Sequence, residues 1–173
     1  MQKLEIDKPL YIEPIIGYRS WRLEKVDPYI IRSSANSHVW KAKEIIQAEC
    51  KELKSPHLYH SYCGIYSNKQ SISLLPYIGA IFGRINGTVY QWGHIIEHEH
   101  GYRSEYAYPR SFDAVSCGRC GNMINGNIMI HNCYFLFIFC SQCAEGNAFY
   151  EDDIPLYTSS SKLLKELNLA YGL

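Results

Sequence analysis

The sequence lacks a long apolar run, an excess of charge of either sign and an apolar leader, and each absence excludes a class of protein. No run approaches the roughly 18 apolar residues that cross a bilayer. The 17 Lys and Arg residues balance 17 Asp and Glu residues, which excludes both a basic chain that coats nucleic acid and a highly acidic, disordered chain. Residues 1–14 are charged and contain no apolar h-region, so we expect no signal peptide and a cytoplasmic location.

Standard catalytic signatures are also missing from the sequence. It contains no P-loop, no GxSxG elbow, no HExxH pair and no glycine fingerprint for dinucleotides. This leaves catalysis undecided and favours a binding module over an enzyme.

The chain does have enough apolar material for a packed core. Its 173 residues and 20.0 kDa fit one domain, or one domain with a small appendage. Hydrophobic residues make up 47% of the chain and 15 residues are Tyr, a side chain that suits the half-buried surface of a sheet. We therefore expect an α+β fold that is mainly β, built as a small antiparallel meander or partly closed barrel with one or two helices.

The β-rich domain is expected to cover residues 1–112. Proline and glycine punctuate its first part, where short strands are expected at residues 10–12 and 17–23. Residues 37–54 predict a helix, because apolar side chains recur there at about helical spacing and a Ser-Pro pair follows.

An Asn-Gly pair predicts a β-hairpin in the middle of this domain. Asn86 and Gly87 lie between the strand-like stretches 81–85 and 88–92. Asn-Gly supplies both positive φ angles of a type I′ turn, so we expect the chain to reverse there.

A longer second strand and one further strand are expected after this turn. The second strand of the hairpin can continue to His98, with a bulge at Gly93. Gly101 then turns the chain into a third strand, residues 102–108, which Pro109 closes.

Two pairs of cysteines predict a metal site within residues 113–146. Cys117 and Cys120 form one CxxC pair, Cys140 and Cys143 form another, and 19 residues separate the pairs. This spacing is typical of a zinc site, because a hairpin between the pairs brings four thiolates around one tetrahedral cation. The segment resembles a zinc ribbon, and a closed shell of four thiolates implies a structural Zn²⁺ rather than a catalytic one. Four unrelated thiols, a redox pair and a disulfide are the alternatives.

Residues 147–173 predict an acidic linker followed by a short C-terminal helix that packs back on the protein. A serine run precedes the helix as an N-cap region, and Gly172 ends it. The apolar stripe expected to face the core consists of Leu163, Leu164, Leu167, Ala170 and Tyr171.

A histidine-rich strand is the second dense group of chemically active side chains. In an extended strand His94, His98 and His100 share one face, while Glu97 and Glu99 share the other. The imidazoles can supply metal ligands or a general base. The alternative is a solvated strand whose glutamates pair with Arg103 and in which one histidine is half-buried against Tyr102.

Two more cysteines and two histidines can form a second metal site. Cys50, His57, His60 and Cys63 give a C-x6-H-x2-H-x2-C spacing, which is not a standard one. Cys63 can instead act as a nucleophile with His98 as its base, if the fold brings the two together.

Three stretches of the chain resemble an uncharacterised group of bacterial and phage proteins. The group shares a YRxWR-like opening, a CGIY[AS] loop and a WGx[VI][VI]EHExGYR[AS]ExAxP segment. The resemblance implies no particular activity. Ser61 stands where many relatives have a further cysteine, two residues before CGIY. The residues that match are Tyr18-Arg-Ser-Trp-Arg22, Cys63-Gly-Ile-Tyr66, Gly87-Thr-Val89, Trp92-Gly93, Glu97-His98-Glu99, Gly101-Tyr102-Arg103, Glu105, Ala107 and Pro109. As a functional cluster the resemblance marks Trp92, Glu97, His98, Tyr102, Arg103 and Glu105.

Three functions remain open from the sequence. The first is a zinc-stabilised intracellular binding, adaptor or regulatory module that contacts protein rather than nucleic acid, with many tyrosines as interface anchors. The second is a small enzyme or a binder of an anionic ligand that uses His98, Glu97, Arg103 and Cys63. The third is a regulator associated with nucleic acid, although the basic residues of 19–54 are largely offset by acidic ones. The oligomeric state is left open.

Overall fold

The architecture was obtained as a computed structural model of the chain. The structure describes residues 10–34, 38–50, 58, 63–71, 82–132, 136–145 and 155–173. Within these residues, no helix has the length and apolar character that crossing a membrane would require.

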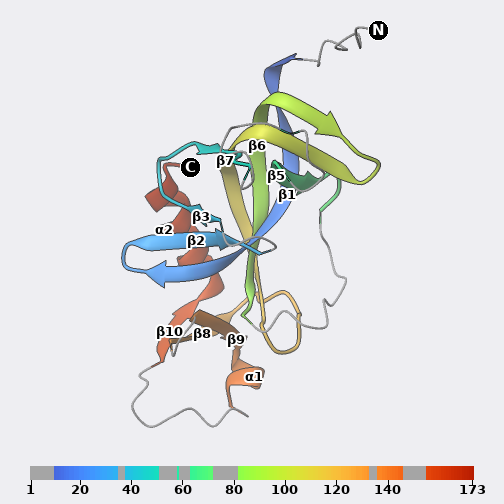
Figure 1. Cartoon of the computed structure of the whole chain (residues 1–173). Helices are drawn as coiled ribbons and strands as arrows, with labels where there is room; N and C mark the ends of the chain where they lie inside the picture. Colours follow the sequence, from blue (N-terminus) through green and yellow to red (C-terminus); the bar gives the residue numbers. More distant parts are fainter. Residues whose placement is uncertain are drawn as a thin grey trace, which may run out of the picture.

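The fold is mainly β, as expected, and its larger sheet has seven antiparallel strands (Figure 1). Strand β1 pairs with β6, β6 with β7, β7 with β5, and β5 pairs back with β1, so four strands form a ring. The expected partly closed barrel is therefore confirmed. The strands are β1 (Leu10–Val26), β2 (Tyr29–Ser33), β3 (Val39–Trp40), β4 (Ile46–Gln47), β5 (Ile65–Asn68), β6 (Arg84–Glu97) and β7 (Gly101–Ser116).

A polar network occupies the inside of this ring. Gln91 of β6 is wholly buried, and its amide group donates to the carbonyl of Ile65 (2.7 Å) and the hydroxyl of Ser104 (2.8 Å). Its amide oxygen accepts from the hydroxyl of Ser67. Buried amides need such partners, so Gln91 joins β5, β6 and β7 from within.

The two short strands expected near the start are parts of one strand. Strand β1 includes both residues 10–12 and 17–23, and its pairing with β6 changes register between Tyr11 and Ile15. A bulge at this position accommodates Pro14, which has no N–H for the ladder.

The hairpin predicted at Asn86 and Gly87 is wrong. Both residues lie inside the continuous strand β6, and β7 passes so close that a Cβ on Gly87 would lie 1.9 Å from the carbonyl oxygen of Ser111. Gly87 is therefore needed for this close approach and not for a turn. The chain reverses at residues 98–100 instead, where the His98 N–H donates to the Gly101 carbonyl (2.8 Å).

The bulge expected at Gly93 is confirmed, but the expected end of the third strand is wrong. Gly93 has a φ of 77°, and the pairing with β7 changes register between Trp92 and Ile95. Strand β7 does not stop at Pro109 but continues to Ser116. Pro109 lies opposite Val89 beside another register shift, a position where a missing N–H is tolerated.

The helix predicted over residues 37–54 is wrong within its described part, residues 38–50. Strand β3 pairs with β2 there, and β4 pairs with β7. From Ile46 to Cys50 the residues alternate between buried and exposed, and Ile45 is 63% exposed, so the pattern that resembled a helical stripe has the period of a strand. Lys43 has a φ of 62°, which breaks any helix at that point.

The C-terminal part forms a second sheet of three strands, ordered β10, β8 and β9. The ribbon hairpin consists of β8 (Asn127–Asn132) and β9 (Leu136–Cys140), and β10 (Leu156–Ser159) pairs with the outer side of β8. A short helix, α1 (Ser141–Ala144), follows β9 directly.

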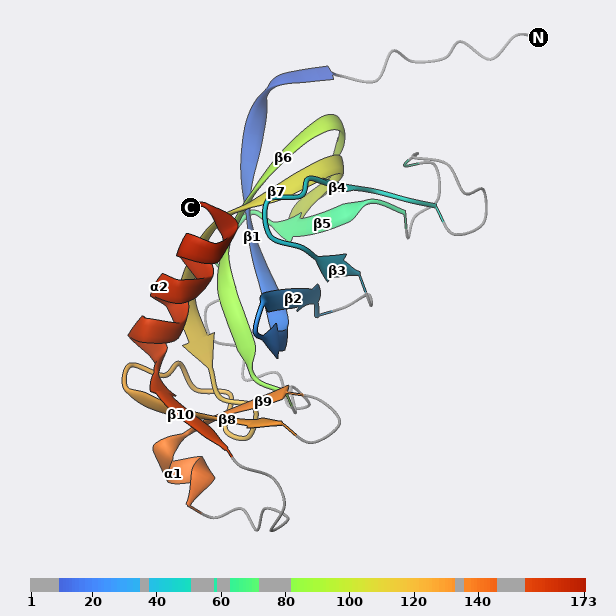
Figure 2. The same ribbon diagram turned by 90° about the vertical axis from the view of Figure 1, so that its left-hand side faces the viewer.

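The expected C-terminal helix is present as α2 (Ser160–Tyr171). The side chain of Ser159 accepts from the N–H of Lys162, and Gly172 ends the helix with a φ of 75°. Figure 2 shows that β10 leads directly into α2 and that α2 lies along the larger sheet.

One hydrophobic core joins the ring, the ribbon and α2. Trp21 packs edge to face against Trp40 and Phe112, and Phe112 packs in the same way against Tyr171. The hydroxyl of Tyr171 donates to the carbonyl of Trp40 (2.5 Å). The last helix therefore packs back on the protein, and it covers the segment where a helix had been expected.

Candidate metal centre

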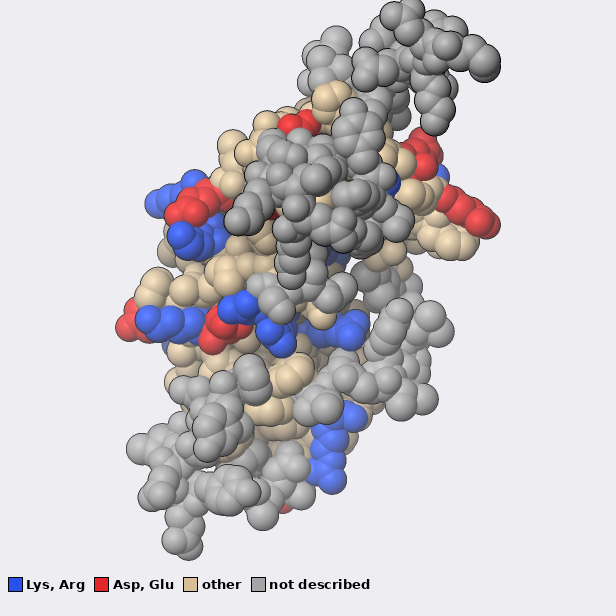
Figure 3. Space-filling view, viewed as in Figure 1, with Lys and Arg blue, Asp and Glu red and all other residues tan. Residues whose placement is uncertain are grey.

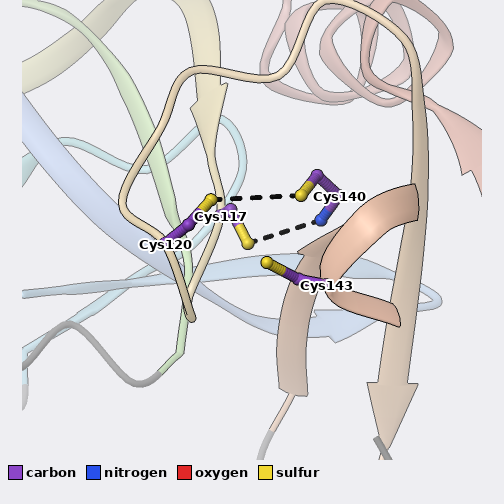
Figure 4. Close-up of side chains that lie close together, drawn as sticks. All are labelled: Cys117, Cys120, Cys140 and Cys143. Carbon is purple, nitrogen blue, oxygen red and sulfur yellow. Dashed lines mark hydrogen bonds between the residues drawn. The ribbon is translucent and has the colours of Figure 1, made fainter. Parts of the chain in front are cut away.

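Four cysteines from three parts of the fold point toward one another (Figure 4). Cys117 directly follows β7 and Cys120 lies in the turn after it, whereas Cys140 ends β9 and Cys143 lies in α1. Their four Sγ atoms all lie within 4.8 Å of one another, so the cluster can hold one metal ion. The residues that the sequence selected as ligands are thus brought together.

The spacing of the sulfurs fits tetrahedral coordination. The Sγ atoms of Cys120 and Cys140, one from each pair, are 4.0 Å apart. A regular tetrahedron with metal–sulfur bonds of about 2.3 Å has sulfurs about 3.8 Å apart. Since no two of the four sulfurs are more than 4.8 Å apart, a contraction of at most about 1 Å brings them all to one cation.

Backbone N–H groups surround the innermost sulfur. Cys117 is buried, and its Sγ accepts from the N–H of Arg119 (3.4 Å) and the N–H of Cys140 (3.4 Å). Burial raises the pKa of the Cys117 thiol, but the backbone hydrogen bonds from Cys120, Cys140 and Arg119 outweigh this effect and lower the pKa to about 7. This site therefore favours the thiolate, which is the form that binds a metal.

The pKa of Cys143 shifts in the opposite direction. Burial, together with hydrogen bonds to the neighbouring thiols, raises the pKa of Cys143 to about 12. Thiolates this close together repel one another unless a cation lies between them, so the cluster as a whole is suited to a bound positive ion.

Local hydrogen bonds explain why the first pair of cysteines forms a tight turn. The N–H of Gly121 donates to the carbonyl of Cys117 (3.0 Å), and the N–H of Cys117 donates to the carbonyl of Asn122 (2.9 Å). Gly121 has a φ of 75°, which the turn requires. The N–H of Gly118 donates to the carbonyl of Ile138 (2.8 Å), which ties this turn to β9.

Two of the four candidates for a second metal site lie within the described residues. Cys50 and Cys63 are both buried, with 0% and 3% of their surface exposed. His57 and His60 lie outside the described residues. The second site thus stays a prediction.

The histidine-rich segment is split between a strand and a turn. His94 lies on β6 beside Glu105, whereas His98, Glu99 and His100 form the exposed turn between β6 and β7. Glu97 pairs with Lys69 at 2.6 Å. The three histidines do not share one strand face, because the strand ends before His98.

The structure does not bring Cys63 and His98 together. The N–H of Lys69 donates to the carbonyl of His100 (3.0 Å), so the histidine turn lies at the far end of β5 from Cys63. Six residues of extended chain span about 20 Å. A Cys–His catalytic pair would need direct contact, so these two residues cannot act as one.

The remaining motif residues make aromatic contacts on separate sides of β7. Arg103 is buried, with its guanidinium 5.9 Å from the centre of the Tyr66 ring. Trp92 stacks on Tyr106, with ring centres 5.9 Å apart. The Lys69 ammonium lies 5.6 Å from the centre of the Tyr102 ring. Sequence reasoning missed Lys69 and Tyr106, because their partners are distant in the chain and no local motif marks them.

Comparisons of this chain with family models, curated proteins and solved structures found no match. The function must therefore be argued from its own residues and geometry.

Proposed function

We propose that the chain is a zinc-stabilised intracellular binding module, an adaptor or regulator whose partner is a protein. The observation that carries this proposal is the convergence of four cysteine sulfurs from the end of β7, the end of β9 and helix α1. The metal is proposed to stabilise the fold, and the binding surface lies elsewhere.

Zinc is the metal that this donor set favours. Soft thiolates in a tetrahedral arrangement select zinc or iron–sulfur chemistry among biological metals, and two CxxC turns around a hairpin are typical of zinc. All described cysteines are free thiols, which fits a reducing compartment. Four sulfurs close the coordination shell and leave no open position for a substrate.

A structural role follows from what the metal would join. The ribbon has a small sheet and shares the core of the ring rather than having one of its own, so a metal at its end would add a cross-link to the burial that holds it. A zinc ion on these cysteines would connect the end of β7, which belongs to the ring, with β9 and α1 of the ribbon.

The side chains outside the metal cluster support binding rather than catalysis. Glu97 and His98 lie at the exposed end of the β6–β7 hairpin, and Cys63 is buried at the other end of β5. By contrast Ile16, Tyr18 and Tyr90 keep 36–46% of their surface exposed on the ring. Exposed tyrosines are frequent anchors of protein interfaces.

Metal analysis and peptide selection test the two parts of the proposal. We expect one zinc per chain by mass spectrometry of the purified protein. We also expect that the loaded chain selects defined peptides from a display library, and that the chain stripped by a chelator loses this ability. A protein without metal, with iron in its place, or with no selected peptide in the loaded form would contradict the proposal.

A further inference from the structure

Strand β10 is an open edge of the three-stranded sheet (Figure 2). Among the described strands it pairs with β8 alone. The opposite edge, β9, is covered, because the N–H of Ile138 donates to the carbonyl of Phe82 (3.0 Å) and its carbonyl accepts from the N–H of Gly118 (2.8 Å). No residue of β10 is buried, and Leu156 and Tyr157 are 47% and 69% exposed. The exposed surface is therefore continuous along the strand.

The strand carries no charge that would protect this edge from pairing. Residues 154–161 contain no charged side chain, whereas natural edge strands commonly carry lysines for that purpose. Elsewhere the surface is charged, and in Figure 3 the Lys and Arg side chains on the left of the view lie beside Asp and Glu. An uncharged edge with exposed apolar side chains is suited to pairing with another strand.

One hydrogen bond fixes the direction of the free backbone groups. The N–H of Ser160 donates to the carbonyl of Gly126 (2.9 Å). This bond continues the pairing of β10 with β8, in which Ser159 lies opposite Asn127. Successive residues of a strand turn their N–H and C=O groups to opposite sides, so those of Tyr157 and Ser159 point away from β8. Their N–H groups have no partner among the residues that the structure describes.

These outward groups complement a second copy of themselves. In an antiparallel pair centred on Tyr157, its N–H and C=O bond the C=O and N–H of Tyr157 in the second copy. The N–H of Ser159 then meets the carbonyl of Pro155 in the second copy. Pro155 has no N–H to offer in return, and the carbonyl of Ser159, the N-cap of α2, already accepts the first bond of the helix. The missing donor thus lies opposite the occupied acceptor, and this register leaves no N–H unpaired.

Charges on the two sides of the strand support the same arrangement. The acidic residues 151–153 precede β10 in the sequence, and Lys162 and Lys165 follow it on α2. The first turn of α2 contains no acidic residue, although a helix N-terminus favours negative charge. Lys162 lies 3.9 Å from Glu166 and its side chain is still 67% exposed. An antiparallel pair brings the start of one strand beside the end of the other, so opposite charges face each other there.

We propose that β10 pairs antiparallel with β10 of a second copy of this chain, and that the protein is a two-fold dimer whose small sheets join into one. The Tyr157 rings then lie side by side across the axis, and Leu156 lies opposite Thr158 of the second copy. The inference goes beyond the proposed function and does not depend on it, because it follows from the sheet edge and not from the identity of a further partner.

The experiment measures the mass of the purified full chain by sedimentation velocity over a range of concentrations. Tyr157→Pro removes the central N–H, which points away from β8, so no bond within the chain is lost. Tyr157→Lys places two like charges at the two-fold axis. The matched control is Leu169→Lys, at a side chain on α2 that is 75% exposed. Circular dichroism verifies folding, and if Tyr157→Pro does not fold, Tyr157→Lys alone decides.

We expect the unaltered chain to sediment as a dimer with twice the 20.0 kDa of one chain. Amide exchange at Tyr157 and Ser159 should slow as the dimer forms. Both changes at Tyr157 should raise the dissociation constant by about tenfold or more, and Leu169→Lys should raise it by much less.

A monomer at every concentration would overturn the inference, as would a dimer that both Tyr157 variants leave intact or that Leu169→Lys weakens equally. A monomer in which a synthetic strand-forming peptide of Thr and Val protects the Tyr157 N–H would also overturn it, and would assign the edge to a strand of another protein.

Discussion

The carboxylate of Glu105 accepts two hydrogen bonds from His94, one from the imidazole Nδ1 (3.0 Å) and one from the backbone N–H (3.3 Å). This pair closes the bulge of β6 at Gly93, whose φ of 77° turns His94 toward β7. Because one of the two hydrogen bonds comes from the backbone of His94, Glu105 keeps that bond when the side chain at this position is changed.

Glu105→Gln is expected to destabilise the protein by about 1 kcal/mol at neutral pH. Burial raises the pKa of Glu105, but the hydrogen bonds from His94 outweigh it and hold the pKa below 4.5. A lowered carboxyl pKa stabilises the fold above the unfolded value and loses this effect as pH falls through the folded value. Denaturant unfolding should therefore show the gap between variant and wild type shrinking below pH 4.5. His94→Ala keeps the backbone contact and should cost less; an equal cost would contradict this account.

Tyr171→Phe is expected to cost about 1 to 2 kcal/mol, because its hydroxyl bonds the carbonyl of Trp40 (2.5 Å) and the N–H of Ile31 (3.3 Å) in the core. Burial raises the pKa of Tyr171 from 10.0 to about 12, so its contribution is complete below pH 10 and lost as pH rises toward 12. Thermal unfolding of Tyr157→Phe, a change at a ring 69% exposed, supplies the control. A similar loss in both variants would contradict the anchoring role.

Lys43→Gly distinguishes the observed loop from the expected helix. Lys43 has a φ of 62°, a conformation that costs a non-glycine residue about 1 to 2 kcal/mol. Glycine should relieve part of this cost and stabilise the protein by about 0.5 kcal/mol, whereas in a helix it would destabilise by about 1 kcal/mol. Lys43→Ala should bring no gain in the loop. Urea denaturation midpoints give the sign directly.

Gly87→Ala tests the close approach of β6 and β7. An added Cβ would meet the Ser111 carbonyl at 1.9 Å, so we expect a loss of about 2 kcal/mol or more. Gly126→Ala is the matched control, since nothing lies within 4 Å of its added Cβ, and it should change stability by no more than about 0.5 kcal/mol. Comparable stabilities of the two variants by chemical denaturation would place Gly87 in open space and contradict the continuous strand.

Cys140→Ser is expected to abolish metal binding and to cost at least about 3 kcal/mol, because the proposed metal cross-link between the ribbon and the end of β7 is lost. Chelation of the wild-type protein should produce the same loss. The combined variant Cys50→Ala and Cys63→Ala leaves the four-cysteine cluster intact and should retain one zinc per chain by elemental analysis. A fall from two metals to one in that variant would reveal the second site, and full stability of Cys140→Ser would argue against a structural metal.

The cluster of four cysteines was predictable because its chemistry is local. A CxxC spacing forms a two-ligand turn from a few neighbouring residues, so Cys117 with Cys120 and Cys140 with Cys143 could be named from the chain alone. The capped C-terminal helix was predictable for the same reason. Its start at Ser159 and its end at Gly172 depend on groups within a turn of each.

Two segments were misread because distant contacts outweighed their local signals. Asn86-Gly87 has the composition of a turn, but pairing with β1 on one side and β7 on the other holds it extended. The stretch around Ile46 has apolar residues at spacings that suit either a helix or a strand. Its pairing with Ala107 of β7 selects the strand.

The order of residues along the chain was sufficient for the β-rich character, the cluster of four cysteines and the final helix, since propensity, spacing and capping act over a few residues. It could not reveal that Cys63 and His98 lie at opposite ends of β5, or that Trp21 pairs with Ile85. Those relationships depend on strand register, which is set by burial across the whole sheet and by close approaches between strands far apart in sequence.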